Sequence, residues 1–439
     1  MVSSKCEKSD FFDTNNSNIL STGPLHHLRH GGMLSSIILL ASCTFGAGIV
    51  TLPYIAAKNG ILLAGCLLLF GAAVSYFCSM ILIKWTEKVH VERYEDFAQH
   101  AYGRRFSIFV AWWNIVTLMG FVISYIVFIK ALIPHVLMIT IGIENIPGIS
   151  KYQSNTNQII SATLYTFIVL IPFSLFRNIG ALRFNSLFGI TWSMYIIFWV
   201  ILLFFFSSEL VESKVENIAD ARYFKISSTG LLNSVPFVVF SYMFQPAIPI
   251  IYIELENRSY KRMWKVVFSL TVLVTTFYFL MSTFGYLGVV HQPHMLKVLI
   301  SQANILEMHY YSVFMKIATI ALLFSLFMWV PGNILVAKNS VELLIDRKLS
   351  TTENIIITIG MWILWYLWGI MFPGISEVIT LLGCTTNPLS GFIFPIIFYL
   401  KIVPDGSLPK KIISCLIFVF IVVISALNFY LFWKYGSTL

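Results

Sequence analysis

The 439-residue sequence contains few charged residues. Only 11% of its residues are charged, whereas 58% are hydrophobic, and the mean hydropathy is +0.81. So little charge cannot cover the surface of a water-soluble protein of this length. The composition therefore excludes soluble enzymes and nucleic-acid-binding proteins, and it predicts an integral membrane protein in a lipid bilayer.

The sequence also lacks the alternation of apolar and polar residues that membrane barrels require. Segments 190–206 and 412–432 are instead nearly continuous apolar runs. We predict an all-α polytopic membrane protein with about eleven spans of roughly 20 residues each. The expected spans are 34–57, 61–83, 107–129, 157–175, 184–206, 231–253, 266–290, 309–337, 354–371, 375–400 and 411–433.

No apolar signal-peptide segment occurs in residues 1–33, which we expect to form a disordered cytoplasmic tail. Eleven spans place the two ends of the chain on opposite sides of the membrane. With the N-terminus in the cytoplasm, twenty of the 29 basic residues fall on the cytoplasmic side, as the positive-inside rule requires. This bias explains the net charge of +9 without a nucleic-acid partner. We expect a transporter domain over 34–433 and an exoplasmic tail over 434–439.

Charged residues are almost absent from the expected spans. Only Lys316 and Glu377 fall inside them, both near span ends, where we expect the side chains to reach the interface. This pattern argues against a channel lined by charged rings and against a proton pump with a buried chain of carboxylates. No paired carboxylates occur within a span and no metal-ligand spacing occurs anywhere, so the sequence predicts no enzyme, cofactor or metal site.

Two of the expected spans contain residues that interrupt a helix. The first carries Gly46 and Gly48 followed by Pro53, and the sixth carries Pro246 and Pro249. The breaks are five spans apart, so the two segments cross the membrane in opposite directions. Interrupted helices at corresponding positions of two inverted halves indicate a transporter's substrate site, although glycine and proline also serve helix packing. We expect inverted repeats over about 34–206 and 231–400, with an extra helix over 411–433.

A short amphipathic helix is predicted between the second and third spans. Tyr94, Phe97 and Tyr102 are separated there by charged and small residues, a pattern typical of a helix on the cytoplasmic interface. We expect this helix to cap the inner ends of neighbouring spans.

The interrupted segments resemble motifs of the amino acid/auxin permease family. The run Thr44-Phe45-Gly46-Ala47-Gly48-Ile49-Val50-Thr51-Leu52-Pro53-Tyr54 is similar to its first-helix signature, roughly G-x-G-I-L-x-L-P-Y-A. In the sixth span, Phe240-Ser241-Tyr242, Gln245-Pro246 and Ile251-Tyr252-Ile253-Glu254-Leu255 also match the family pattern. The segments 94–103 and 383–400 fit as well, and the resemblance covers about residues 33–433.

The resemblance implies a LeuT-like fold of ten helices in two inverted five-helix repeats plus one extra helix, which moves amino acids by alternating access. Backbone N–H groups freed at the first break would hold the substrate's carboxylate, and carbonyls freed at the sixth-span break would accept from its ammonium group. The expected substrate-binding residues are Thr44, Phe45, Gly46, Ala47, Gly48, Phe240, Ser241, Tyr242 and Gln245.

Two positions bear on the coupling ion. Sodium-coupled members of the family carry Asn four residues before the first signature glycine and Thr shortly before the proline of the eighth span. This chain has Ser42 at the first position, and only Ser325 offers a hydroxyl at the second. We therefore expect proton coupling or exchange rather than sodium coupling, with Ser42 and Ser325 as candidate ion-coupling residues.

Together these features predict a secondary active transporter of neutral or cationic amino acids. We expect it in the plasma membrane or in a vacuolar or lysosomal-type membrane. A sodium-coupled symporter, an amino-acid sensor that retains the fold, and a channel remain open as alternatives.

Overall fold

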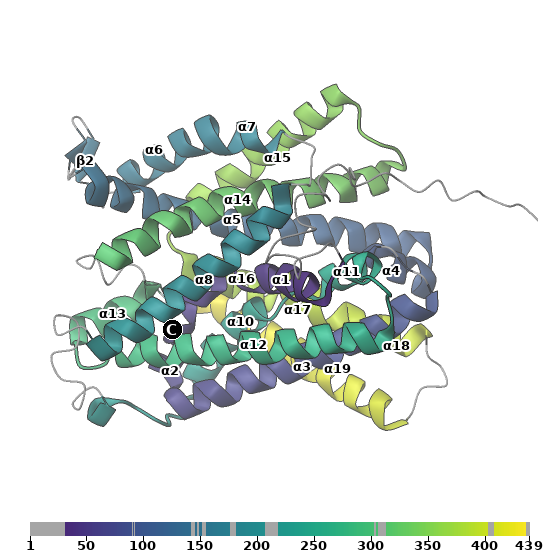
Figure 1. The fold of residues 1–439 in the computed structure, drawn as a ribbon, viewed down its shortest axis with the longest axis horizontal. Coiled ribbons are helices and arrows are strands. Elements are labelled where there is room, and N and C mark those ends of the chain that lie inside the picture. The colour runs from purple at the N-terminus through teal and green to yellow at the C-terminus, as the bar shows by residue number, and fades with distance from the viewer. Residues whose placement is uncertain are drawn as a thin grey trace, which may run out of the picture.

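The computed structural model describes residues 31–89, 91, 93–141, 145–146, 149–151, 155–175, 181–206, 218–302, 304–305, 313–402 and 408–435. This part of the chain is almost entirely helical (Figure 1). Three segments lie outside the described residues: residues 1–30 of the expected N-terminal tail, residues 207–217 between the fifth and sixth expected spans, and residues 436–439 of the expected C-terminal tail.

The first half of the chain contains five of the expected spans. They are formed by α1 Met33–Thr44 with the 3-10 helix η3 Ala47–Thr51 and α2 Leu52–Asn59, by α3 Ile61–Val89, by α5 Arg104–Ile141, by α6 Asn155–Tyr165 with the π-helix η4 Thr166–Leu170 and α7 Ile171–Ser174, and by α8 Ala181–Phe206. The expected interfacial helix is α4 Tyr94–Tyr102, and a short antiparallel pair, β1 Asn145–Ile146 and β2 Ile149–Lys151, follows α5.

The second half contains five more of the expected spans and one further helix. Its spans are α10 Ser228–Ser241 with the 3-10 helix η5 Gln245–Ala247 and α11 Ile248–Glu254, then α12 Tyr260–Leu287, α14 Val313–Ile345 and α15 Thr351–Met371. The next span combines α16 Ile375–Cys384, α17 Thr386–Pro388, the π-helix η7 Leu389–Ile393 and α18 Phe394–Ile402. The short helix α13 Pro293–Gln302 precedes α14, and α19 Leu408–Tyr435 is the extra helix.

The described residues contain nine helices long and apolar enough to cross a membrane, or ten if the bent pair Met33–Thr44 and Gly48–Asn59 is one span. The expected span over 184–206 falls within α8, in which Leu187–Leu202 forms a shorter apolar stretch. The predicted all-helical, multi-span architecture is therefore confirmed, with nine to ten spans where about eleven were expected.

Several helices continue past the expected spans, and two of these helices bury a lysine. The third span was expected to end at residue 129 and the eighth at residue 337, but α5 continues to Ile141 and α14 to Ile345. As a result, Lys130 and Lys338 lie inside helices, and each is only 2% exposed. The sequence analysis had placed both lysines at or beyond a span end, because the apolar run stops there.

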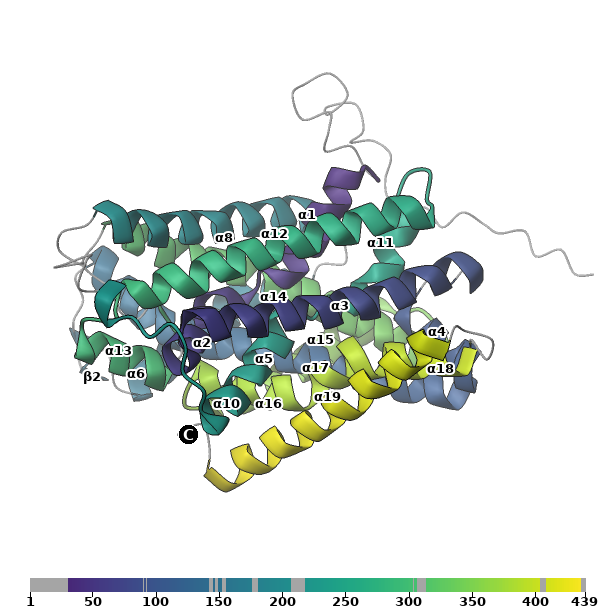
Figure 2. The same cartoon turned by 90° about the horizontal axis from the view of Figure 1, so that it is seen from below.

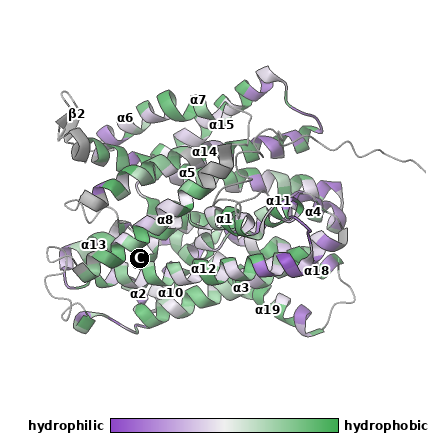
Figure 3. Ribbon diagram, in the orientation of Figure 1, coloured by the Kyte–Doolittle hydropathy of each residue, from purple (hydrophilic) through white to green (hydrophobic). Residues whose placement is uncertain are grey.

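The polar segments of the bundle gather at its ends. In both views α4, α11 and α18 lie at one end, whereas α13 and β2 lie at the other (Figures 1 and 2). Hydrophilic residues are concentrated near α4, α11 and α18, while the long helices are mostly hydrophobic (Figure 3). An apolar middle with polar ends is the arrangement that a bilayer requires.

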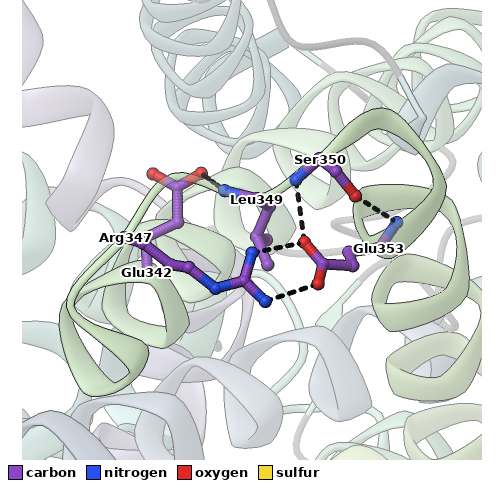
Figure 4. A network of polar contacts seen from close by, with 5 residues as sticks. All are labelled: Glu342, Arg347, Leu349, Ser350 and Glu353. Carbon is purple, nitrogen blue, oxygen red and sulfur yellow. Dashed lines mark hydrogen bonds and ion pairs between the residues drawn. The ribbon is translucent and has the colours of Figure 1, made fainter.

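The turn between α14 and α15 is fixed by a polar network (Figure 4). The guanidinium group of Arg347 donates to both carboxylate oxygens of Glu353, at 2.8 and 2.6 Å. The Glu353 carboxylate also accepts from the backbone N–H of Ser350, and the backbone N–H of Glu353 donates to the Ser350 hydroxyl. This reciprocal pair is a capping box at the start of α15. Glu342 accepts from the N–H of Leu349. These contacts fix the start of α15 relative to the end of α14.

The core lies where the two halves of the chain meet. The centrally placed α5 packs against α14 and α15, and α12 packs against α1, α2, α3 and α8. The extra helix α19 runs along the outside of the bundle (Figure 2) and contacts α16, α18 and η7. The two interrupted spans are therefore enclosed by uninterrupted helices of both halves.

Candidate functional site

The first helix break lies between α1 and η3. The helix α1 ends at Thr44, and Gly46 has an extended backbone, with φ −87° and ψ −151°. The chain then resumes as η3 and α2, and the two arms of the span differ in direction by 54°. Pro53 lies in the first turn of α2, where its missing N–H has no helical partner to lose.

The second break follows α10. Tyr242, Met243 and Phe244 separate the end of α10 from η5, and α11 continues the span to Glu254. Pro246 and Pro249 occupy the first turns of η5 and α11, again the positions in a helix that tolerate proline. Both interruptions expected from the sequence are therefore present.

The two breaks contact each other directly through a glycine. A Cβ atom on Gly48 would lie 2.9 Å from the Oγ of Ser241 and 3.2 Å from the Cδ1 of Phe240. Both distances are closer than ordinary van der Waals contact, so only glycine lets these segments approach this closely. A Cβ on Gly46 would meet its nearest neighbour, the Tyr125 hydroxyl of α5, at an ordinary 3.8 Å.

The hydroxyl of Tyr278 on α12 joins the last carbonyls of the two broken helices. Its oxygen lies 2.6 Å from the carbonyl oxygen of Thr44 and 2.9 Å from that of Ser241. These carbonyls end α1 and α10, so they have no partner in their own helix. Tyr278 is fully buried, and the contact ties both breaks to one uninterrupted helix.

Gln245 stabilises the second break from within. Its Nε2 donates to the Ser75 hydroxyl of α3 at 2.7 Å and to the Tyr242 carbonyl at 3.2 Å, and its Oε1 accepts from the N–H of Phe244 at 2.9 Å. Ser75 also donates to the Tyr242 carbonyl. The side chain of Gln245 is fully buried and its hydrogen bonds are internal, so it holds the unwound segment in place.

The aromatic residues expected at the site face different neighbours. Phe45 meets Phe277 and Tyr278 edge to face, and the Tyr242 hydroxyl donates to Thr275, so both side chains pack against α12. Phe240 packs against Phe121 of α5, with ring centroids 5.5 Å apart.

The backbone donors at the first break remain available. Gly46, Ala47 and Gly48 open η3, and among the described residues no acceptor bonds to their N–H groups, as is usual at a helix N-terminus. The carbonyls at the second break are already engaged, because Ser241 accepts from Tyr278 and Tyr242 accepts from Ser75 and Gln245.

The expected ion-coupling residues differ in their contacts. The Ser42 hydroxyl donates to the carbonyl of Leu39, and the Thr44 hydroxyl similarly donates to Leu40, so both turn back onto α1. The Ser325 hydroxyl on α14 is fully buried, and among the described residues it has no hydrogen-bond partner. No hydrogen bond in the described part of the chain joins Ser42 to Ser325.

The buried charges are not those that the sequence indicated. Lys316 is half-buried, and Glu377, in the first turn of α16, interacts electrostatically with Lys130. Lys130 donates to the carbonyl of Phe372 at 2.5 Å, and Lys338 donates to that of Ser174 at 3.1 Å. A helix C-terminus carries a partial negative charge, which favours an ammonium group there.

Comparison with known proteins identifies this architecture. The profile of a family described as transmembrane amino acid transporter protein matches residues 29–435. A solved structure, the crystal structure of MhsT in complex with L-phenylalanine, is similar over 92% of this chain and 98% of that chain, with a TM-score of 0.60 and 14% identity. A substrate-bound outward-open sodium-coupled sialic acid symporter is similar over 91% of this chain and 90% of its own, with a TM-score of 0.47 and 12% identity. The first likeness shows the fold and confirms the predicted LeuT-like architecture.

Proposed function

Because the chain belongs to the transmembrane amino acid transporter family, we propose that it is a secondary active transporter that carries amino acids by alternating access. Its substrate would bind where the breaks of the first and sixth spans meet. The main support is the close approach of Gly48 to Phe240 and Ser241, beside backbone N–H groups that have no acceptor among the described residues.

The proposed site suits the carboxylate of an amino acid. The free donors of Gly46, Ala47 and Gly48 lie at the N-terminus of η3, where the helix dipole favours a negative group. For the ammonium group, the carbonyl oxygen of Ser241 accepts from Tyr278 and keeps its second lone pair. The carbonyl of Tyr242 already accepts from both Ser75 and Gln245, so it is the weaker candidate. The described side chains that contact the two breaks are apolar, hydroxyl or amide groups, and this supports a neutral substrate.

We further propose proton coupling or exchange as the energy source. Sodium is held by several oxygen ligands, and at the two positions that bear on the coupling ion this chain offers only the hydroxyls of Ser42 and Ser325. Sodium coupling stays the second candidate, because the buried Ser325 hydroxyl has no partner among the described residues and could serve as one ligand.

Transport by purified protein in proteoliposomes tests these proposals. A panel of labelled amino acids, each measured in counterflow at two pH values, should identify a substrate with saturable exchange. A sensor that only retains the fold would show no counterflow, and a channel would show no saturation. Replacing sodium by choline should leave uptake unchanged, whereas strict dependence on sodium would contradict the proposed coupling and leave the fold intact.

A further inference from the structure

A buried carboxylate lies where α4, α5 and α14 meet. Glu95, in the first turn of α4, is only 5% exposed. Its Oε1 accepts from the Nδ2 of Asn114 on α5 at 2.9 Å and from the hydroxyl of Ser340 on α14 at 3.4 Å. Asn114 and Ser340 also lie 3.4 Å apart, so the three polar groups form one cluster.

The two side chains that donate hydrogen bonds to the Glu95 carboxylate in this cluster, Asn114 and Ser340, are both neutral. Among the described residues no lysine, arginine or histidine forms an ion pair with Glu95. Burial raises the pKa of its carboxyl above the usual range, because the ionised form loses its hydration. The residue's own N–H and the amide of Asn114 act in the opposite direction, but their effect is smaller.

Among the described residues, the charged groups near this junction form no ion pair with Glu95. On α4 itself, the negative charge of Asp96 raises the pKa of Glu95 further. Arg93, directly before α4, lowers this pKa, but its effect is the smallest of all the contributing groups. Arg104 at the start of α5 is paired with Asp346, and Lys338 on α14 donates to the Ser174 carbonyl. Two more charged groups contact other residues. Lys401 of α18 lies over the Tyr102 ring, and Glu342 of α14 accepts from the backbone N–H of Leu349.

We propose that Glu95 is a proton-binding site of this transporter, protonated while α4, α5 and α14 are packed together and deprotonated to the cytoplasm when the junction opens. This inference rests on the proposed proton coupling, and it identifies Glu95 as the residue that binds the coupled proton.

The direction of the pH effect follows from the cluster. A carboxyl whose pKa is raised in the packed state binds its proton more tightly there than in water. The packed junction is therefore fully stabilised below the ordinary carboxyl pKa and loses that stabilisation as the pH rises through the raised pKa. A less acidic cytoplasm favours opening, which is the direction needed for a proton that enters with the substrate.

The test uses proteoliposomes that contain a pH-sensitive dye, with a mixture of the common amino acids added outside. The wild-type protein should acidify the lumen when the amino acids are added. Glu95→Gln mimics the protonated carboxyl and should retain amino-acid counterflow while losing all acidification. Glu87→Gln, which alters an exposed carboxylate on α3, is the control and should retain both activities.

A second variant keeps the proposal testable if Glu95→Gln fails to fold. Asn114→Ala removes the amide donor that stabilises the ionised carboxyl, so the pH at which acidification is half-maximal should rise by roughly one unit, a tenfold change in proton binding. An unchanged midpoint, or full acidification by Glu95→Gln, would overturn the assignment of Glu95 and leave proton coupling intact. Counterflow by the wild-type protein without any acidification would instead refute proton coupling itself.

Discussion

Lys130 and Lys338 make equivalent contacts in the two halves of the protein. Lys130, on the third span, donates to the carbonyl of Phe372 at the end of the ninth span, α15. Lys338, on the eighth span, donates to the carbonyl of Ser174 at the end of the fourth span, α7. Exchanging spans three and four with spans eight and nine converts one contact into the other. This correspondence supports the proposed repeats over 34–206 and 231–400.

Loss of either lysine should destabilise the protein. Lys130→Met and Lys338→Met keep the apolar stem but leave a buried carbonyl without its donor, which costs about 1–3 kcal/mol. The two losses should add in the double variant, because α5 and α14 run in opposite directions and their C-terminal ends lie at opposite ends of the bundle (Figure 1). Thermal unfolding in detergent measures both effects. Lys348→Met, at an exposed lysine, is the control and should change nothing.

Removing the hydroxyl of Tyr278 should affect transport more than folding. Tyr278→Phe leaves the Thr44 and Ser241 carbonyls without a shared donor, so we expect a loss of about 1 kcal/mol in stability and a lower maximal transport rate. Tyr286→Phe, on the same helix α12 and outside the proposed site, loses the hydrogen bond from the N–H of Arg222 and serves as the matched control. Equal transport rates for the two variants would show that the Tyr278 contact has no role in coupling the breaks.

The two glycines of the first break should respond differently to a methyl group. Gly48→Ala places a Cβ 2.9 Å from the Ser241 hydroxyl, and overpacking of this kind costs about 1–3 kcal/mol, whereas Gly46→Ala fits at 3.8 Å. Ser241→Ala removes the nearest atom and should partly restore stability and uptake to Gly48→Ala. A Gly48→Ala protein as stable as Gly46→Ala would contradict this geometry.

The proposed orientation can be tested with cysteine labelling. Lys225 and Lys261 are both exposed, one before α10 and the other at the start of α12. In a variant without its six native cysteines, a membrane-impermeant thiol reagent applied outside should label Lys225→Cys and not Lys261→Cys. The reverse pattern would invert the topology, and with it the side to which Glu95 releases its proton.

The sequence predicted the helices well because each apolar run is a local property. The breaks were also predictable, since Gly48, Pro53 and Pro246 act on their own backbone. The ends of α5 and α14 were not predictable in this way. Lys130 looks like a span end, and its burial depends on a carbonyl 242 residues further along the chain.

The residues missed at the candidate site share that long-range origin. Tyr278 is one of several tyrosines in the sequence, and its role depends on Thr44, 234 residues away. The burial of Glu95 could have been predicted from its position on α4, but the sequence analysis considered only the aromatic residues of this helix. Glu95 lies three residues before Ala98 and six before Ala101, on the face of α4 that is buried, so a carboxylate is turned inward there.

The Tyr278 hydroxyl has two acceptors but only one hydrogen to give. At any moment the hydroxyl donates its hydrogen mainly to one carbonyl, either that of Thr44 or that of Ser241. The other carbonyl oxygen then lies close to the hydroxyl oxygen without a full hydrogen bond. If one broken helix swings away during transport, the hydroxyl rotates fully to the one that stays, so the departing helix does not leave a buried donor unsatisfied. With such a movement, the single hydroxyl of Tyr278 would keep an acceptor in either case, because each broken helix offers one carbonyl oxygen.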